Sequence, residues 1–406
     1  MPRVGVLSPE ESEYPDLVQE AGGEPVPLGL PLIRPAGVAL HREWAADWAQ
    51  ISCSGEDLDG LLISAAEPAE LAGSLIAALR LGLPAILAAP LANPFTIALA
   101  ALGFASFTED PARVAVWLSG SGSPSSRELV EGFSLANALR TGLAAGAGPE
   151  LLVHLAALAR EAGTVGFPQM IRVLAPESPQ IVDLRSSWFA AHGAVGLFAH
   201  LDAILHDTPT VAGPLKEILP PAPAASEMVG SRLVFIRGRA SGTEAVCRTD
   251  GSVDELSGDC RFYASEEAAI QGIANGTVGP LDLLVVGGCG PRGRPGLLRL
   301  DRLGQALSDA GLDVPVLTDG LPPDDSVSGH WASLATPEAA LGGVISRLRD
   351  GDPLRLDLTE GLIRTSLTAE KLARREPFMI PTCPGFGYAA RYARAALSAL
   401  EGAGFG

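Results

Sequence analysis

Short apolar runs alternate with segments of helical spacing in the first half of the chain. Residues 58–64 (LDGLLIS) and 84–89 (PAILAA) have the length and composition of buried strands. Between them, residues 67–81 repeat apolar positions at the spacing of a helix. A strand, a helix and a second strand in this order predict a parallel pair with a crossover helix. The first half is therefore predicted to be an α/β domain.

Further elements are expected along the rest of this half. Ser125 and Ser126 stand before Glu128, which is the pattern of a helix N-terminal capping signal. The predicted helices cover residues 127–145, 150–162 and 194–205, and a strand is predicted over 180–184.

The pattern changes at Pro220, Pro221 and Pro223, a stiff stretch typical of a linker. Beyond it, short strand-like runs predominate, and a hairpin turn is predicted between the first two, at Ala240, Ser241 and Gly242. The predicted strands are 231–237, 244–248, 281–286, 314–317, 343–349, 354–358 and 362–366, with helices at 297–310 and 388–400. We therefore predict an α/β domain over residues 1–222 and a β-rich domain over 223–406.

Composition and charge narrow the class of protein. Hydrophobic residues make up 47% of the chain and charged residues 19%, which is the balance of a compact globular protein. A formal charge of −18 opposes binding to nucleic acid or to an anionic membrane surface. The first residues run directly into strand-like sequence, so no signal peptide is expected. The apolar region 71–107 is broken by several prolines and Arg80, which argues against a membrane span.

Five cysteines are present, an odd number, widely spaced and without a CxxC pair. They are Cys53, Cys247, Cys260, Cys289 and Cys383. This pattern indicates neither a zinc site nor a disulfide framework, and it fits reduced thiols in a cytoplasmic protein.

Several motifs occur in an order that matches one enzyme family. Residues 59–64 (DGLLIS) are followed by 77–86 (AALRLGLPAI), and residues 152–163 read LVHLAALAREAG. In the second half, residues 262–268 (FYASEEA) precede residues 290–297 (GPRGRPGL). The remaining matching segments are 317–320 (LTDG), 329–330 (GH), 336–339 (TPEA) and 350–353 (DGDP).

Together these segments resemble the dihydroxy-acid and sugar-acid dehydratase family over most of residues 55–400. The resemblance implies an N-terminal α/β sandwich with parallel strands, followed by a β-barrel-like C-terminal domain. It also implies a homodimer, with an active site between the two domains and close to the neighbouring subunit.

The departures from the family concern its cofactor ligands. The family's cluster cysteine, metal-binding aspartate and metal-binding lysine align with Glu67, Pro68 and Ala69, and proline and alanine have no ligand side-chain atoms. Much of the segment with the other cluster cysteines is missing between residues 102 and 119. Cys289 stands where the family has a magnesium-binding glutamate, and residues 321–328 differ from its serine-base loop. We therefore expect neither an iron–sulfur cluster nor magnesium, and no other cofactor.

Cys289 is the first candidate for catalysis. It follows a predicted strand between glycines, whose backbone N–H groups could line a small anion pocket. Arg292 and Arg294 could lower the pKa of the thiol, and Arg292 could also bind substrate. The alternative is a small buried residue that fills the space of the lost glutamate.

His330 is the second candidate, as a general acid or base. The family's own GH pair offers an alternative, in which the histidine is kept for loop structure. In the same loop, Asp319 is a third catalytic candidate, and Ser326 and Ser328 are candidates for substrate binding. Asp, Ser, Pro and Gly are also favoured in turns, so turn formation is the alternative there. Glu67 is a candidate for the wall of the pocket.

Three functions stay open from the sequence. The first is a cofactor-independent enzyme that eliminates, isomerises or cyclises a small organic, natural-product-like substrate by acid–base or thiol chemistry. The second is a catalytically inactive homologue that binds a ligand or a partner chain. The third is a metal-dependent sugar-acid dehydratase with relocated ligands.

Overall fold

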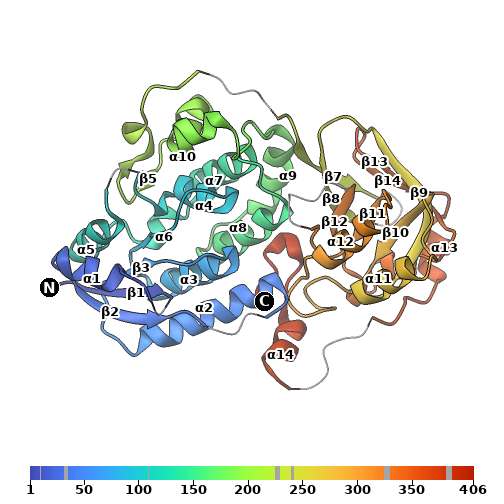
Figure 1. Ribbon diagram of the computed structural model, residues 1–406. Coiled ribbons are helices and arrows are strands. Elements are labelled where there is room, and N and C mark those ends of the chain that lie inside the picture. Colours follow the sequence, from blue (N-terminus) through green and yellow to red (C-terminus); the bar gives the residue numbers. More distant parts are fainter. Residues whose placement is uncertain are drawn as a thin grey trace. The chain divides into compact units, whose positions relative to one another are not determined.

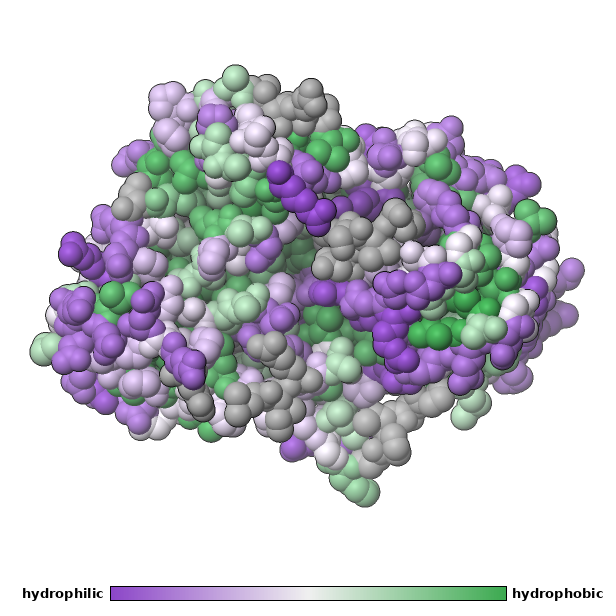
Figure 2. Space-filling model, viewed as in Figure 1, coloured by the Kyte–Doolittle hydropathy of each residue, from purple (hydrophilic) through white to green (hydrophobic). Residues whose placement is uncertain are grey.

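The computed structural model describes residues 1–9, 11–31, 35–107, 109–224, 229–238, 242–323, 330–380 and 386–406. These residues form two compact units. The first unit contains Met1–Arg34, His41–Ala147 and His154–Val229. The second contains Pro35–Leu40, Gly148–Val153 and Gly230–Gly406. Figure 1 shows the helices and strands of each unit, and Figure 2 shows hydrophilic side chains over much of the visible face of each.

A parallel sheet lies in the first unit, with strands in the order β2-β1-β3-β4. The strands are β1 (Arg3–Ser8), β2 (Glu24–Gly29), β3 (Gly60–Ile63) and β4 (Ala85–Leu87). All residues of β3 and β4 are buried, which explains why they read as continuous apolar runs without alternation. Helix α3 (Pro68–Leu81) connects β3 to β4, and Leu61 pairs with Ala85 in parallel register. The predicted strand–helix–strand unit is confirmed.

Helices form most of the rest of this unit. They are α1 (Tyr14–Glu20), α2 (Val38–Ser54), α4 (Pro94–Leu99), α5 (Pro111–Ser121), α6 (Ser126–Leu129), α7 (Gly132–Ala144), α8 (Pro149–Glu161), α9 (Phe167–Glu177) and α10 (Ser187–Leu201), with a π-helical turn at Ala100–Phe104. Two short strands, β5 (Pro209–Thr210) and β6 (Gly213–Pro214), pair with each other. The predicted capping signal is confirmed, because Ser125 and Glu128 form a reciprocal capping box.

Two predictions in this unit were wrong. The single helix expected over 127–145 is two helices, because Val130 leaves helical backbone geometry and a second capping box starts at Glu131. Residues 180–184 form no strand. The N–H groups of Ile181 and Val182 instead donate to the carbonyl of Ala144 at the end of α7, at 2.9 and 3.1 Å. The C-terminal carbonyl of a helix has thus replaced a neighbouring strand as their partner.

The second unit is built around a closed, eight-stranded barrel in the order β10-β11-β12-β8-β7-β14-β13-β9. The strands are β7 (Arg232–Arg237), β8 (Glu244–Thr249), β9 (Glu255–Tyr263), β10 (Asp282–Val286), β11 (Val316–Thr318), β12 (Trp331–Thr336), β13 (Pro353–Asp357) and β14 (Leu362–Thr365). The helices are α11 (Glu266–Ala274), α12 (Asp301–Asp309), α13 (Ala369–Arg374) and α14 (Tyr388–Ala395). Strands β9, β10, β11 and β12 are parallel, whereas β8 and β13 run antiparallel to their neighbours.

The two faces of the barrel strands bury different sets of side chains. Leu283 and Val285 belong to one apolar cluster with Leu317, whereas Leu284 and Val286 belong to another with residues of α11 and α12. This alternation places the first cluster inside the barrel and the second between the barrel wall and the helices. The predicted fold class, an α/β unit with parallel strands and a barrel-like unit, is confirmed.

Several details of the second half differ from the sequence prediction. Residues 343–349 contain a 3₁₀ turn at Val344–Arg347 and no strand. Helix α12 starts at Asp301, later than expected, and α14 ends at Ala395. Strands β9 and β12 were not predicted at all, although the hairpin of β7 and β8 was. Within the described residues, no helix is both long and apolar enough to cross a membrane.

Candidate functional site

Loops from three parallel strands gather at one edge of the barrel. Val286 of β10 pairs with Thr318 of β11, and β11 is parallel to β12, so their carboxyl ends face the same way. Cys289 and Asp319 follow the first two strands, and Glu338 follows the third. Ligands commonly bind at this edge of parallel sheets, so the edge is the first place to look for chemistry.

Asp319 is the centre of this edge. Its side chain is 1% exposed and accepts three backbone hydrogen bonds. The N–H of Cys289 donates at 2.8 Å, that of Ala339 at 2.9 Å and that of Gly288 at 3.1 Å. Burial raises the pKa of the Asp319 carboxyl, and these backbone donors act in the opposite direction. Asp319 therefore ties the loops after β10 and β12 to the end of β11.

Glu338 is a second buried carboxyl at the same edge, and it was not singled out from the sequence. It is 5% exposed and accepts the backbone N–H of Arg292 at 3.0 Å. Burial and the neighbouring Asp319 raise the pKa of Glu338 to about 7. The signal that could have found it is a lone acidic residue directly after a buried strand.

Cys289 is fully buried on the helix-covered side of the barrel wall. It packs in a cluster with Val286, Leu300 and Leu303, and its Sγ lies 3.9 Å from the carbonyl oxygen of Gly287. Burial, and then the charges of Asp319 and Glu266, raise the pKa of the Cys289 thiol well above its usual value. Arg294 acts to lower this pKa, as expected, but its effect is smaller than that of burial, so the pKa is raised.

The expected anion pocket beside Cys289 is also not found as predicted. The N–H groups of Gly288 and Cys289 already donate to Asp319, and that of Gly287 donates to the carbonyl of Tyr263 at 2.9 Å. These donors are thus used within the chain. A catalytic role for Cys289 or Asp319 stays a prediction.

The two arginines of the glycine-rich loop have partners within the second unit. The Nε of Arg292 donates to the carbonyl of Ala396 at 2.7 Å, and its backbone N–H donates to Glu338. Arg294 forms an ion pair with Glu267. Arg292 is therefore held in place by the fold, and its predicted role in substrate binding is untested.

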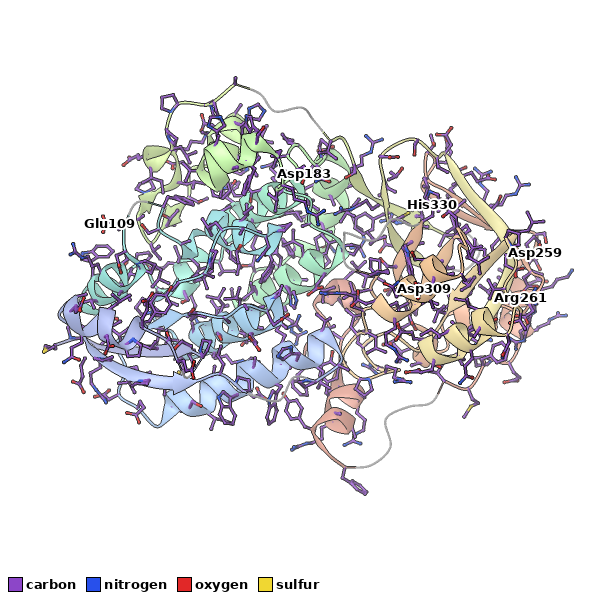
Figure 3. The ribbon with its side chains drawn as sticks, in the orientation of Figure 1. Glu109, Asp183, Asp259, Arg261, Asp309 and His330 are labelled. Atoms are coloured by element: carbon purple, nitrogen blue, oxygen red, sulfur yellow. The ribbon has the colours of Figure 1, made fainter. Side chains whose placement is uncertain are left out.

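His330 lies at the opposite end of the parallel strands (Figure 3). It precedes β12, and its carbonyl accepts the N–H of Val316 at the beginning of β11, at 2.9 Å. Its side chain is half-buried and contributes to lowering the pKa of Asp250, which is lowered mainly by hydrogen bonds from Ser252. The structure thus brings Cys289 and Asp319 together, and it does not bring His330 to them.

The other predicted residues do not join this edge. Ser326 and Ser328, with Asp324 and Asp325, lie outside the described residues. Glu67 belongs to the first unit, where it is exposed and occupies the N-cap position of α3 without a side-chain capping hydrogen bond to the helix. Its predicted role in substrate binding is untested.

The residues present do not fit the metal groups that the family resemblance implies. Pro68 and Ala69 form the start of α3 and offer no side-chain donor atoms. The thiol of Cys289 is buried with a raised pKa, although a thiolate is the form that binds metals. Within the part of the chain that the structure describes, no three His, Cys, Asp or Glu side chains are grouped to hold a metal ion.

The sequence of the barrel unit relates this chain to dehydratases, which are carbon–oxygen lyases. Residues 217–403 match the family model described as "Dihydroxy-acid/6-phosphogluconate dehydratase C-terminal". Through this C-terminal domain, the chain is a distant member of the dihydroxy-acid/6-phosphogluconate dehydratase family.

Individual relatives support this assignment. The dihydroxy-acid dehydratase of Geobacter metallireducens is 30% identical over 305 residues, which cover 68% of this chain and 54% of the relative. The enzymes of that name from Geobacter sp. (strain M21) and Thermus thermophilus are each 29% identical, over 304 and 299 residues. These matches cover 68% and 66% of this chain and 54% of each relative. The chain thus spans about half the length of the curated relatives it matches.

Proposed function

We propose that this chain uses the dehydratase barrel as a ligand-binding scaffold and does not carry out dehydration by the family's metal chemistry. The observation behind the proposal is the use of backbone donors at the strand ends. The backbone N–H groups of Gly288, Cys289 and Ala339 donate to Asp319, and those of Arg292 and Gly293 donate to Glu338.

An active site that stabilises an anion must leave backbone N–H donors free for its substrate. Stabilising a developing oxyanion requires preorganised N–H donors that point at the substrate. Here the N–H groups of Gly288, Cys289 and Ala339 converge on Asp319, which is nearly inaccessible to solvent. A buried carboxyl in this position fills the donor site and also repels an incoming anion. These contacts serve to hold the loops in place.

The direct test is a turnover assay after reconstitution. The full chain would be supplied with iron, sulfide and magnesium without oxygen, and then incubated with 2,3-dihydroxy acids and sugar acids. The dihydroxy-acid dehydratase of Thermus thermophilus, treated in the same way, is the positive control. We expect no 2-oxo acid product above the protein-free blank. Stoichiometric iron and sulfide together with turnover would contradict the proposal and favour a dehydratase with relocated ligands.

A second candidate function is a cofactor-independent lyase, isomerase or cyclase, and Glu338 is the observation that favours it. A buried carboxyl with a pKa of about 7 can take up and release a proton at neutral pH. In an elimination, the Glu338 carboxylate would take the proton from carbon and pass that same proton to the leaving hydroxyl, which departs as water and leaves the carboxylate regenerated.

This second candidate has its own test. Carbonyl and hydroxy-acid substrates would be screened with a chelator present, using the unaltered chain, Glu338→Gln and the exposed control Glu370→Gln. Turnover that is lost only in Glu338→Gln, with the pH profile of the unaltered chain breaking near 7, would support it. Equal turnover in all three proteins would rule out Glu338 as the proton carrier.

Homodimer formation is proposed from the family resemblance alone. Light scattering coupled to size-exclusion chromatography would measure the mass directly. A mass near twice the 41.8 kDa of one chain is expected, and a mass near one chain would contradict the proposal.

A further inference from the structure

A pocket of about 400 Å³ lies in the barrel unit, away from the buried carboxyls described above. It is formed by barrel strands, the 3₁₀ turn at Val344–Arg347 and helix α13. Its lining residues are mainly aliphatic. They include Leu317, Val344, Ile345, Leu348, Leu354, Leu362, Ile363, Leu367 and Leu372, with Thr243 and Thr365 among the polar ones.

The strand register shows which side chains face the barrel interior. Leu354 and Leu356 of β13 belong to the interior apolar cluster. They pair directly with Thr365 and Ile363 of β14, so these two share the inner face. Arg364 lies between them and pairs with Arg355, which places it on the outer face.

Two charged residues, Glu360 and Arg364, belong to the part of the pocket lining that the structure describes. The Nη2 of Arg364 lies 3.1 Å from Oδ2 of Asp357, and the Arg364 side chain is about half exposed. Glu360 is exposed in the turn before β14. The uncharged hydroxyl side chains among the described lining residues are Thr243 and Thr365, and Oγ1 of Thr365 already accepts the N–H of Leu367 at 3.3 Å.

We propose that this barrel pocket binds an uncharged, mainly hydrocarbon small molecule with at most one or two hydroxyl or carbonyl groups. Such pockets are apolar with a few placed polar groups, and covering the leucines with hydrocarbon is favourable. An anion or cation among the leucines would lose its hydration, because the charged groups described at the pocket are exposed and Arg364 is already paired with Asp357. A cavity of about 150 Å³ accommodates benzene. A pocket of about 400 Å³ can therefore hold a ligand that needs roughly two to three times as much space as benzene.

This inference names the ligand class of the proposed binding function and rests on that proposal. It uses a different site from the strand-end loops. Its experiment can therefore fail separately from the turnover assay.

The test uses two fluorescent probes with the same ring system. N-phenyl-1-naphthylamine is uncharged, and 1-anilinonaphthalene-8-sulfonate adds a sulfonate to it. Each is titrated into the full chain. We expect saturable binding of the uncharged probe at one site per chain. The sulfonate should bind at least about tenfold more weakly, because its charge would lose hydration among the leucines.

Two matched variants locate the site. Thr365→Trp fills the inner face of β14, and it should weaken binding of the uncharged probe at least about tenfold by overpacking the pocket. Arg355→Trp places the same indole on the outer face of β13, where the side chain is 65% exposed, and should leave binding within about twofold. If circular dichroism shows that Thr365→Trp is unfolded, Thr365→Phe is used instead. This smaller substitution is expected to weaken binding of the uncharged probe several-fold.

Each outcome has one meaning. Absence of saturable binding, unchanged binding in the Thr365 variant, or equal binding of both probes would overturn the pocket proposal. Probe binding at the pocket in a chain that also dehydrates dihydroxy acids would refute the proposed function and leave the pocket standing. If the chain neither dehydrates these acids nor binds the probe, the pocket proposal is refuted and the proposed function is not.

Discussion

Arg42 in the first unit and Asp319 in the second are both buried charged groups, and they are held in different ways. In the first unit, Arg42 is fully buried and its Nη2 lies 2.8 Å from Oε1 of Glu43 on the same helix. In the second unit, Asp319 is almost as deeply buried, and its carboxyl accepts three backbone N–H groups. Arg42 is thus paired with another side chain, whereas Asp319 is paired with the backbone of neighbouring loops.

The consequences for structure differ accordingly. Arg80 on α3 lies 2.9 Å from Asp47 on α2 and 3.1 Å from Glu161 on α8, so ion pairs connect helices that already have complete backbone hydrogen bonding. Asp319 and Glu338 instead satisfy donors that no strand or helix would satisfy. At this edge of the barrel, the buried carboxyls of Asp319 and Glu338 hold loop backbone, and burial raises the pKa of each.

The largest expected effect follows removal of the Asp319 carboxyl. Asp319→Ala leaves three buried N–H donors without an acceptor, at about 1–3 kcal/mol each before relaxation. We expect a loss of about 4–5 kcal/mol in the free energy of unfolding, measured by urea titration. A loss below about 1 kcal/mol would mean that the loops do not depend on this residue.

A somewhat smaller effect is expected from Arg42→Met in the first unit. Removing one partner leaves Glu43 buried, which costs about 3 kcal/mol. The cost is reduced because Nη2 of Arg80 also lies 3.8 Å from Glu43. The double variant Arg42→Met/Glu43→Met should recover much of the loss, as measured by urea titration. A double variant less stable than either single one would show that the pair is not the reason for the loss.

The pH dependence of stability is expected to reflect Glu338. In the unfolded chain this carboxyl titrates near 4.5, whereas in the folded chain its pKa is about 7. Between these values the folded state binds the proton and the unfolded state does not. The free energy of unfolding therefore falls as pH rises from about 4.5 to 7, by up to about 3 kcal/mol, and then levels off.

Glu338→Gln isolates this contribution, since an amide does not titrate. Its stability should change less across the same pH range than that of the unaltered chain, whereas the exposed control Glu370→Gln should follow the unaltered chain. Thermal denaturation at half-unit pH steps measures the difference. Parallel curves for Glu338→Gln and the unaltered chain would contradict the assigned pKa.

The smallest effect is expected from Cys289→Ala. The sulfur lies in an apolar cluster and its loss removes only a small volume, so we expect about 1–2 kcal/mol less stability, measured by urea titration. The backbone N–H that Cys289 donates to Asp319 is kept in this variant. A loss comparable with that of Asp319→Ala would mean that the thiol has a larger role than packing.

Local patterns predicted much of the fold. The apolar runs around Leu61 and Ile86 indicated parallel strands, because buried strands in α/β proteins lack alternation. The strand expected over 180–184 failed, because its N–H groups pair with a helix end that is distant in sequence. Such a tertiary partner leaves no local signal in the composition of the segment itself.

The site was predictable only in part. Cys289 and Asp319 were each singled out from the sequence, but their contact was not predicted; the structure joins them through the backbone N–H of Cys289. Sequence proximity to arginines gave the wrong direction for the Cys289 thiol, since burial outweighs them. The distance of His330 from Asp319 and the burial of Glu338 both depend on the register of β11 and β12, which the sequence does not give.

The central claim is that the edge with Cys289 and Asp319 holds the loops and is not a reactive site. Its most direct test is the rate of alkylation at each cysteine of the native protein against pH, followed by peptide mass spectrometry. The account predicts that Cys289 reacts only as fast as the chain unfolds, at every pH below that of unfolding. Fast labelling of Cys289 in the folded chain, with an apparent pKa below about 8.5, would contradict it.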